Sequence, residues 1–260
     1  MTAAFDPTKV ATHLLDAHAR RVPFVNLPAA IAPTSIAEAY AAQDALVRIL
    51  GEREGPIAGL KIATTTKVMQ ELMGIDHPCG GVIFERRVHR SPARIRLADY
   101  MNVVIECEVA LRLKSELSVT AAPFTAENVK GAVGQVMAAF ELVEDRKADY
   151  KQTNALSVIA ENCWNAGIVL GPETAFSPER SLTGIRGRLA INGRDANEGR
   201  SDDPLSTLAW VANLAASRGR ALAAGMVVIT GSVIVTLPIK PGDRFVFTLD
   251  GFGAAEVSAE

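Results

Sequence analysis

Apolar and polar positions alternate along residues 103–113 with the two-residue period of a β-strand. The odd positions are all apolar, whereas the even positions include Glu106, Glu108 and Arg112. Because successive side chains of a strand point to opposite faces, this pattern predicts a strand with one face in the core. Further short apolar runs predict strands at residues 82–88, 136–143, 167–170, 187–191, 227–235 and 245–249.

Helical spacing replaces this alternation in the first part of the chain. Asp6-Pro7 is a helix start signal, and Ser35 with Glu38 forms a capping box for a second helix. Residues 21–33 contain three prolines and are expected to be irregular. Among the later strands, residues 204–217 carry apolar side chains at helical spacing and predict one further helix.

Strands in succession with few crossover helices favour a β-rich α+β fold over a doubly wound sheet. Asn192-Gly193 adds a hairpin turn signal. We therefore expect an N-terminal helical segment over residues 1–55 and a β-rich domain over residues 56–260, joined as one structural unit. The length of 260 residues is ample for a sizeable core.

The composition is that of an ordinary globular protein, with 48% hydrophobic residues, 22% charged residues and a formal net charge of −2. No basic surplus favours nucleic acid or an anionic membrane as a partner. The first six residues lack the basic region and apolar core of a signal peptide, and no run reaches the roughly 18 apolar residues of a membrane span. We therefore expect a cytoplasmic protein.

Several common chemical signatures are missing from the sequence. There is no GxGxxG after a strand, no GxxxxGK[ST] and no GxSxG, so dinucleotide binding, P-loop chemistry and an α/β-hydrolase have no support. Cys79, Cys107 and Cys163 show no CxxC spacing and indicate neither a disulfide framework nor a zinc cluster. We interpret Cys107 as a small core residue.

Glu106 and Glu108 share one face of the strand predicted at 103–113. Two like charges at this spacing repel each other and lose hydration unless a cation or protons neutralise them. Glu141, in the apolar run 136–143, is a candidate third ligand. Three carboxylates without a supporting histidine or cysteine suit Mg²⁺ or Mn²⁺ rather than zinc or copper. The alternative is that Glu106 and Glu108 lie on a solvated face of the sheet.

Two further residues are candidates for acid–base chemistry. Lys61 stands between Leu60 and Ile62, and a lysine buried there must pair with an anion or lower its pKa. The alternative is that Lys61 reaches solvent along its aliphatic stem. His77 lies in a turn-rich loop before a strand, and functional residues concentrate in such loops.

In their order and spacing, these segments resemble the 2-keto-4-pentenoate hydratase family within the fumarylacetoacetate hydrolase superfamily. The matching segments are Ala39-Tyr40-Ala41-Ala42-Gln43, Gly59-Leu60-Lys61-Ile62, Met69 to Gly74, Glu106-x-Glu108, Phe140 to Arg146, Asn162 with Gly167 to Gly171, Pro204 to Asn213, Ala224-Gly225, Thr230-Gly231-Ser232 and Pro241-Gly242-Asp243. The resemblance implies a long coiled sheet wrapped as a β-roll, with residues 56–260 as the catalytic domain. It also implies a divalent metal on Glu106, Glu108 and Glu141, with Lys61 beside the substrate as an acid/base or carboxylate-binding group.

Several positions depart from the family pattern and bear on the substrate. Cys79 stands in a loop where the family often has an acidic residue, and Trp164 stands where a small residue is usual. Asp203 differs from the residue usual before the late helix. We expect these three side chains to line or border the substrate pocket. The resemblance also places the turn that carries Thr230 and Ser232 at the site.

The resemblance implies a metal-dependent hydratase that adds water to a 2-hydroxy-2,4-dienoate in aromatic or related catabolism. The substrate is then a small 2-oxo or 2-hydroxydienoic acid, and Lys61, ahead of His77, is the candidate for proton transfer. The alternatives are a 4-oxalocrotonate-type decarboxylase, an acylpyruvate hydrolase and a non-catalytic partner subunit. A homo-oligomer is expected, as is a complex with a related family subunit.

Overall fold

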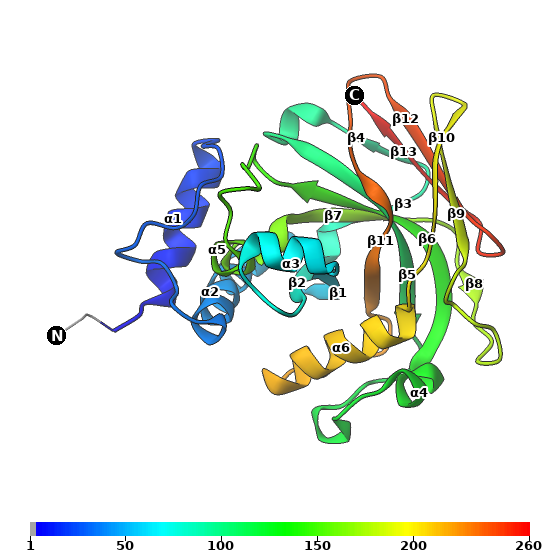
Figure 1. Cartoon of the computed structure of the whole chain (residues 1–260), viewed down its shortest axis with the longest axis horizontal. Coiled ribbons are helices and arrows are strands. Elements are labelled where there is room, and N and C mark those ends of the chain that lie inside the picture. The colour runs from blue at the N-terminus through cyan, green and yellow to red at the C-terminus, as the bar shows by residue number, and fades with distance from the viewer. Residues whose placement is uncertain (1–3) are drawn as a thin grey trace.

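Two β-sheets, with helices gathered mainly at one side, make up the computed structural model of the chain, which describes residues 4–260 (Figure 1). Residues 1–3 of the expected N-terminal segment lie outside the described residues. The α-helices are α1 (Pro7–Ala19), α2 (Ile36–Glu54), α3 (Lys67–Met73), α4 (Ala126–Val129), α5 (Ala155–Ala160) and α6 (Pro204–Ser217). The strands are β1 (Ile57–Ala63), β2 (Cys79–Phe84), β3 (Val88–Arg90), β4 (Ala93–Ile95), β5 (Val103–Leu113), β6 (Val133–Glu144), β7 (Asn165–Leu170), β8 (Thr174–Ala175), β9 (Arg186–Ile191), β10 (Arg194–Arg200), β11 (Val227–Pro238), β12 (Arg244–Leu249) and β13 (Ala254–Ala259).

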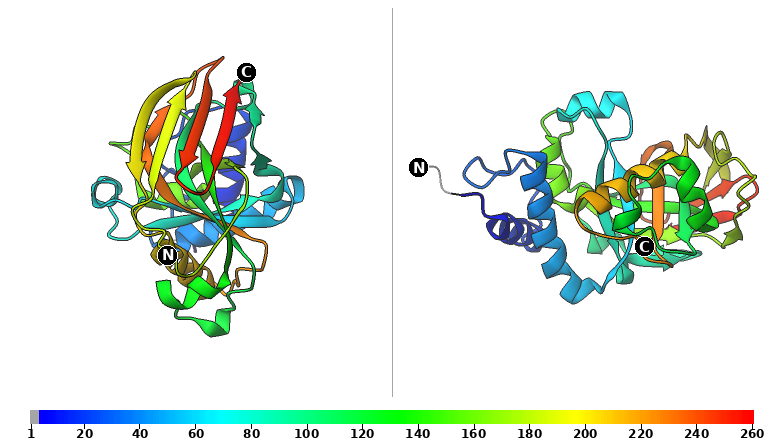
Figure 2. Two further views of the ribbon diagram at one scale, coloured as in Figure 1. Left: turned by 90° about the vertical axis from the view of Figure 1, so that its right-hand side faces the viewer. Right: turned by 90° about the horizontal axis from the view of Figure 1, so that it is seen from below.

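The larger sheet carries β5 at its centre. Its strand order is β2-β1-β11-β5-β6-β7-β3, with β8 paired to β6. Most neighbours are antiparallel, whereas β1 with β11 and β3 with β7 are parallel. The second sheet has the order β10-β9-β12-β13-β4, and its long strands lie side by side in the left view of Figure 2. The expectation of a β-rich α+β fold with an N-terminal helical segment is confirmed.

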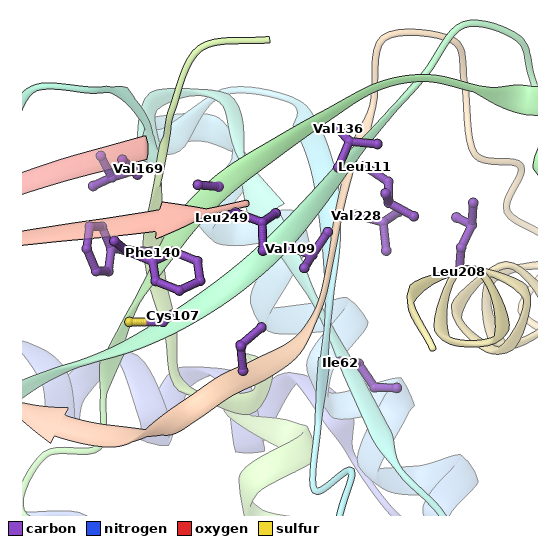
Figure 3. Packing of buried hydrophobic residues seen from close by; sticks show 14 of the residues in the cluster. Ile62, Cys107, Val109, Leu111, Val136, Phe140, Val169, Leu208, Val228 and Leu249 are labelled. Atoms are coloured by element: carbon purple, nitrogen blue, oxygen red, sulfur yellow. The ribbon is translucent and has the colours of Figure 1, made fainter. Parts of the chain in front are cut away.

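The core side of β5 is buried between the two sheets. Cys107 and Val109 are each 1% exposed, and Figure 3 shows them in one cluster with Phe140 of β6. Phe140 reaches Phe247 of β12, with ring centroids 6.1 Å apart, so aromatic packing joins the sheets. The predictions of a strand at 103–113 and of Cys107 as a core residue are confirmed.

Side-chain caps fix where the predicted helices begin. The Asp6 carboxylate accepts hydrogen bonds from two backbone N–H groups of the first turn of α1, and Ser35 accepts one from Glu38 at the start of α2. The Glu38 carboxylate binds Thr34 rather than returning to Ser35, so the expected capping box forms only by half. α6 packs against β11 and β1 through apolar side chains such as Leu208. No helix within residues 4–260 is long and apolar enough to cross a membrane.

The strands differ from the expectation at two places. The run 82–88 is not one strand, because β2 ends at Phe84 and a 3₁₀ turn over Glu85–Arg87 leads to β3. The Arg87 guanidinium holds this turn, with Nε and Nη2 at 2.8 and 3.0 Å from the Glu54 carboxylate. The hairpin turn expected at Asn192-Gly193 is confirmed, because it joins β9 to β10, but no alternation of side chains marks β10 itself. β10 is an exposed edge strand, and without a buried face its side chains need not alternate.

Candidate active site

Three carboxylates converge on the face of the large sheet opposite the core side of β5. Alternation places Glu106 and Glu108 on this face, and the strand register sets Glu141 of β6 directly opposite Glu106. One oxygen of each carboxylate lies within 4.8 Å of the corresponding oxygens of the other two. The structure therefore brings together the three residues that the sequence indicates as metal ligands.

Burial makes this cluster unfavourable without a cation. Glu108 and Glu141 are 0% exposed. Glu108 Oε2 accepts a 2.6 Å hydrogen bond from the Gly231 N–H, and Glu141 Oε1 accepts a 2.9 Å bond from Asn165 Nδ2. The other oxygens, Glu108 Oε1 and Glu141 Oε2, have no hydrogen-bond partner. Coordination to a cation would satisfy these oxygens, so the set fits a divalent metal, and the alternative of a solvated face is wrong for Glu108.

The same burial changes the protonation of two carboxyl groups. Loss of hydration raises the pKa of Glu141 to about 7, with Lys61 opposing this shift and Glu106 adding to it. Burial, followed by repulsion from Glu141 and Glu106, raises the pKa of Glu108 well above its usual range. A divalent ion would replace the protons, because it stabilises the ionised forms.

Lys61 of β1 lies against the carboxylates. Its side chain is 3% exposed, and Nζ lies 3.1 Å from Glu141 Oε1. Nζ also donates to the backbone oxygen of Cys163 at 3.4 Å. Burial lowers the pKa of Lys61, but the carboxylates, Glu141 first, outweigh burial and hold this pKa above its usual value. The ammonium is therefore kept charged, and the alternative that Lys61 reaches solvent is wrong.

A cavity of about 680 Å³ lies beside the cluster, a size typical of small-molecule sites. Lys61 and Glu106 form part of its wall, and Glu106 accepts a 2.6 Å hydrogen bond from Thr236 Oγ1 of β11. Much of the remaining wall is apolar and comes from α3, α5 and the strands of the large sheet. It includes Met69, Met73, Val104, Val143, Val158 and Leu237.

The pocket residues indicated by the sequence divide between this wall and the layer behind it. Trp164 and Ser232 line the cavity. Thr230 is outside the wall, and its Oγ1 donates to a backbone oxygen of β5 at 2.9 Å. Cys79 is buried behind the wall, where its Sγ lies 3.3 Å from the Oγ1 of Thr64, a wall residue.

His77 and Asp203 lie outside the wall of this cavity. His77 Nδ1 is 2.6 Å from the backbone oxygen of Pro78. Asp203 caps α6 by accepting a 3.1 Å hydrogen bond from the Ser206 N–H. The structure brings neither side chain to the carboxylates, and a catalytic role for His77 stays a prediction.

Asp145 and Tyr150 line the cavity although the sequence pattern does not single them out. Asp145 is 5% exposed and accepts a 3.1 Å hydrogen bond from the Tyr150 hydroxyl. Glu141, Val143 and Asp145 follow one another at alternate positions, so continuing the alternation of β6 is the signal that finds Asp145. Tyr150 has no such signal, because it lies in the loop after β6.

Known proteins resemble this chain in sequence. The family model of the fumarylacetoacetate (FAA) hydrolase C-terminal region matches residues 75–258. A 2-keto-4-pentenoate hydratase of Burkholderia vietnamiensis is 29% identical over 212 residues, which cover 80% of this chain and 79% of that protein. A 4-oxalocrotonate decarboxylase of Pseudomonas putida is 28% identical over 236 residues, which cover 85% of this chain and 84% of that protein.

A solved structure resembles this chain over nearly its whole length. It is the 4-oxalocrotonate decarboxylase from Pseudomonas putida G7, complexed with magnesium and adipate. The TM-score is 0.88 at 24% sequence identity, and the match covers 98% of this chain and 97% of that one. At this identity the likeness shows the fold, N-terminal helices included, and it agrees with the β-roll expected from the sequence.

Proposed function

This chain belongs to the fumarylacetoacetate hydrolase family, and from that premise we propose that it is a divalent-metal-dependent hydratase, a hydro-lyase. Its substrate is a 2-hydroxy-2,4-dienoate of the 2-keto-4-pentenoate type, to which it adds water in aromatic or related catabolism. One observation carries the proposal: Glu106, Glu108, Glu141 and the buried Lys61 meet beside a cavity large enough for a small acid. The relative in Burkholderia vietnamiensis, a 2-keto-4-pentenoate hydratase, supports the choice of reaction.

Glu106, Glu108 and Glu141 are the residues that would hold the ion, and their all-oxygen ligand set favours Mg²⁺ or Mn²⁺. When bound, such an ion would attract the acid end of the substrate and would stabilise negative charge on its 2-oxygen. The protein keeps the ligands in place: the Gly231 N–H holds Glu108, and Asn165 holds Glu141.

Lys61 is the group that moves protons in this proposal. A cation on the triad would offset the carboxylate charge that raises the pKa of Lys61, so that its ammonium can donate a proton to carbon 5 of the dienol. The 2-hydroxyl proton passes to solvent, which yields the unsaturated 2-oxo acid. The neutral amine then takes a proton from the water that attacks carbon 4. Solvent supplies the proton that is added to carbon 3, which replaces the one that the 2-hydroxyl released to solvent. Lys61 ends as it began, and the sum is the addition of one water molecule.

A 4-oxalocrotonate-type decarboxylase is the second candidate, because one relative of that name is 28% identical to the chain. The same carboxylates and the same lysine would serve it, since loss of CO₂ from a 2-oxo dioate passes through an enolate of the same kind. The intact triad and the buried Lys61 argue against a non-catalytic subunit.

The expected assembly and location belong to the same proposal. We propose a cytoplasmic homo-oligomer, able to associate with a related family subunit. Light scattering after gel filtration should then give a mass that is a multiple of the 27.6 kDa of one chain. A mass of one chain at micromolar concentration would contradict the oligomer.

A turnover screen tests the reaction. Purified protein with Mg²⁺ or Mn²⁺ is offered 2-hydroxypenta-2,4-dienoate, 2-hydroxyhexa-2,4-dienoate, 4-oxalocrotonate and an acylpyruvate. The proposal expects a 4-hydroxy-2-oxo acid from at least one of the two dienoates, with no product in Glu141→Gln. Release of CO₂ from 4-oxalocrotonate without hydration of any dienoate would replace the hydratase by the decarboxylase.

A further inference from the structure

The cavity has a charge pattern along its length that separates two classes of substrate. We propose that it accepts 2-hydroxydienoates whose distal end is an uncharged alkyl or aryl group and rejects those with a second carboxylate. Asp145 is the discriminating residue. This inference rests on the proposed function, in which the first carboxylate of the substrate lies at the triad of glutamates.

The strands set the direction in which a substrate extends. In the register of β5 with β6, Glu106 lies opposite Glu141, and Val104 lies opposite Val143. Both valines line the cavity, about 6.6 Å farther along their strands than the two glutamates. Asp145, directly after β6, continues the same face and lies about 13 Å from Glu141 along the chain direction.

β11 forms a second wall in the same direction. Ser232 is paired with Glu108 at the metal end, and Pro238 is paired with Val104 farther along. Every residue from Ser232 to Pro238 lines the cavity, so the cavity is elongated along the strands. A substrate whose carboxylate and 2-oxygen lie at the triad therefore points its distal carbons toward Val104 and Asp145.

Among the residues that the structure describes, no cationic side chain lines the end of the cavity that lies away from the triad. Of the described side chains that line the cavity, Lys61 alone is cationic, and it is already paired with Glu141 at 3.1 Å. Arg146 follows Asp145 in the sequence but is outside the cavity wall. Its Nε and Nη2 bind the Glu161 carboxylate at 2.7 and 2.8 Å, so its charge is used elsewhere.

Asp145 instead brings a negative charge to that end. Its carboxylate accepts hydrogen bonds from Asn102 Nδ2 at 2.6 Å, from the Lys147 backbone N–H at 2.9 Å and from the Tyr150 hydroxyl at 3.1 Å. All three donors are uncharged, so they orient the carboxylate without cancelling its charge. A second carboxylate on the substrate would meet this like charge in a buried wall, where water screens repulsion poorly.

Between the triad and Asp145, an uncharged distal group of the substrate would meet a rigid apolar part of the cavity wall. Val104, Val143 and Trp164 line this stretch. The Trp164 ring is held edge-on by Phe24 and Tyr150, with centroids 4.9 and 5.5 Å away. Trp164 Nε1 has no hydrogen-bond partner, but one neutral donor does not offset the charge of a carboxylate.

Two saturated 2-oxo acids test the proposal without turnover. 2-Oxohexanoate and 2-oxoadipate share the chelating head and the chain length, and they differ in a terminal methyl or carboxylate. In titration calorimetry on the Mg²⁺-loaded full chain, we expect 2-oxohexanoate to bind at least about tenfold more tightly. This preference should shrink by about tenfold in Asp145→Asn and in Asp145→Ser, the second neutral variant. Asp149→Asn, an exposed aspartate of the same loop, is the matched control and should keep the wild-type ratio.

The outcomes separate this inference from the proposed function. Equal or tighter binding of 2-oxoadipate by the wild type overturns the inference and leaves the hydratase standing. If Asp145→Asn and Asp145→Ser both keep the wild-type preference for 2-oxohexanoate, Asp145 is not the discriminating residue. Binding of neither acid overturns the shared premise that the acid head lies at the triad. If 2-oxohexanoate is preferred as expected but no dienoate is hydrated, the inference stands and only the hydratase is rejected.

Discussion

At the scale of single residues, Glu108 has two oxygens in opposite environments. Oε2 accepts the Gly231 N–H, whereas Oε1 is buried without a partner. A buried acceptor without a partner, next to two other carboxylates, is unfavourable in the metal-free protein. Its position is therefore explained by binding a cation and not by stability.

Replacing Glu108 tests this explanation. Glu108→Gln should abolish Mg²⁺ binding in titration calorimetry while the metal-free protein stays folded. The amide keeps an oxygen for the Gly231 N–H and has the shape and neutrality of the protonated carboxyl, so little stability should be lost. Glu127→Gln, at a side chain that is 84% exposed, should bind Mg²⁺ as the wild type does. Undiminished affinity in Glu108→Gln would refute the ligand assignment.

The pKa of Glu141, raised by burial to about 7, predicts how metal binding depends on pH. In the metal-free fold Glu141 keeps a proton that the unfolded chain releases above roughly pH 4.3. The free energy of unfolding of the metal-free protein should therefore fall as the pH rises from roughly 4.3 to about 7. Mg²⁺ needs the ionised form, so its affinity should rise over the same window, by up to roughly tenfold per pH unit for each proton displaced. Equal calorimetric affinities at about pH 5.5 and about pH 8 would contradict this coupling.

Lys61 should matter for turnover and not for the metal. Lys61→Met keeps the length of the side chain and removes the transferable proton, so kcat should fall by roughly 10²-fold or more while Mg²⁺ still binds. Lys67→Met, at an exposed position at the start of α3, is the matched control and should keep full activity. Equal rates for Lys61→Met and the wild type would show that another group transfers the proton.

At the scale of elements, an irregularity in β11 shapes the carboxylate cluster. The pairing of β11 with β5 shifts between Ile229 and Ser232, and Gly231 there has a φ of +103°. Glycine adopts this backbone conformation without the strain that a Cβ would cause. The distortion directs the Gly231 N–H to Glu108, so the shape of the strand sets the position of this carboxylate.

Gly231→Ala should disturb both the strand and the site. The positive φ should cost about 1–3 kcal/mol of stability, and a displaced N–H should weaken Mg²⁺ binding by about 10–100-fold. Gly219→Ala, just after α6, has a φ of +70° and nothing within 4 Å of an added Cβ, so it should lose stability alone. Thermal unfolding and calorimetry on both variants check the prediction. Wild-type Mg²⁺ affinity in Gly231→Ala would show that the irregularity does not position Glu108.

Elements with one buried face are predictable from the sequence, because burial imposes a pattern on side chains. β5 and α6 have the bounds that the alternation and the helical spacing predict. The exposed edge strand β10 lacks such a pattern. The turn over Glu85–Arg87 is equally invisible, because an ion pair with the distant Glu54 stabilises it.

The residues of the site likewise divide into those that a local sequence pattern reveals and those that it does not. Glu106 and Glu108 are conspicuous because charges on an otherwise apolar strand are unfavourable. Trp164 enters the cavity from a turn with a φ of +59°, and no local pattern gives the direction of its ring. Cys79 and Thr230 lie where the sequence places the site, yet neither reaches the cavity wall, because a segment match does not give the direction of a side chain.

At the scale of the whole molecule, the cavity lies where distant segments meet, since its wall draws on residues between Lys61 and Pro238. The N-terminal segment takes part from behind this wall. Phe24, after α1, packs edge-on against Trp164, and Arg146 donates to the Val22 backbone oxygen at 2.6 Å. These contacts tie residues 4–55 to the cavity. The boundary near residue 55, with both parts joined as one structural unit, stays a prediction.

Mass spectrometry of the product shows directly whether the protein adds water to a dienoate and whether it needs the metal to do so. The protein is incubated with Mg²⁺ and, in separate samples, with 2-hydroxypenta-2,4-dienoate and 2-hydroxyhexa-2,4-dienoate; samples with EDTA and samples of Glu108→Gln run in parallel. We expect a product that is one water molecule heavier than the substrate, formed only by the wild type with Mg²⁺. A product that has gained no water, or hydration that persists after chelation of the metal, would contradict it.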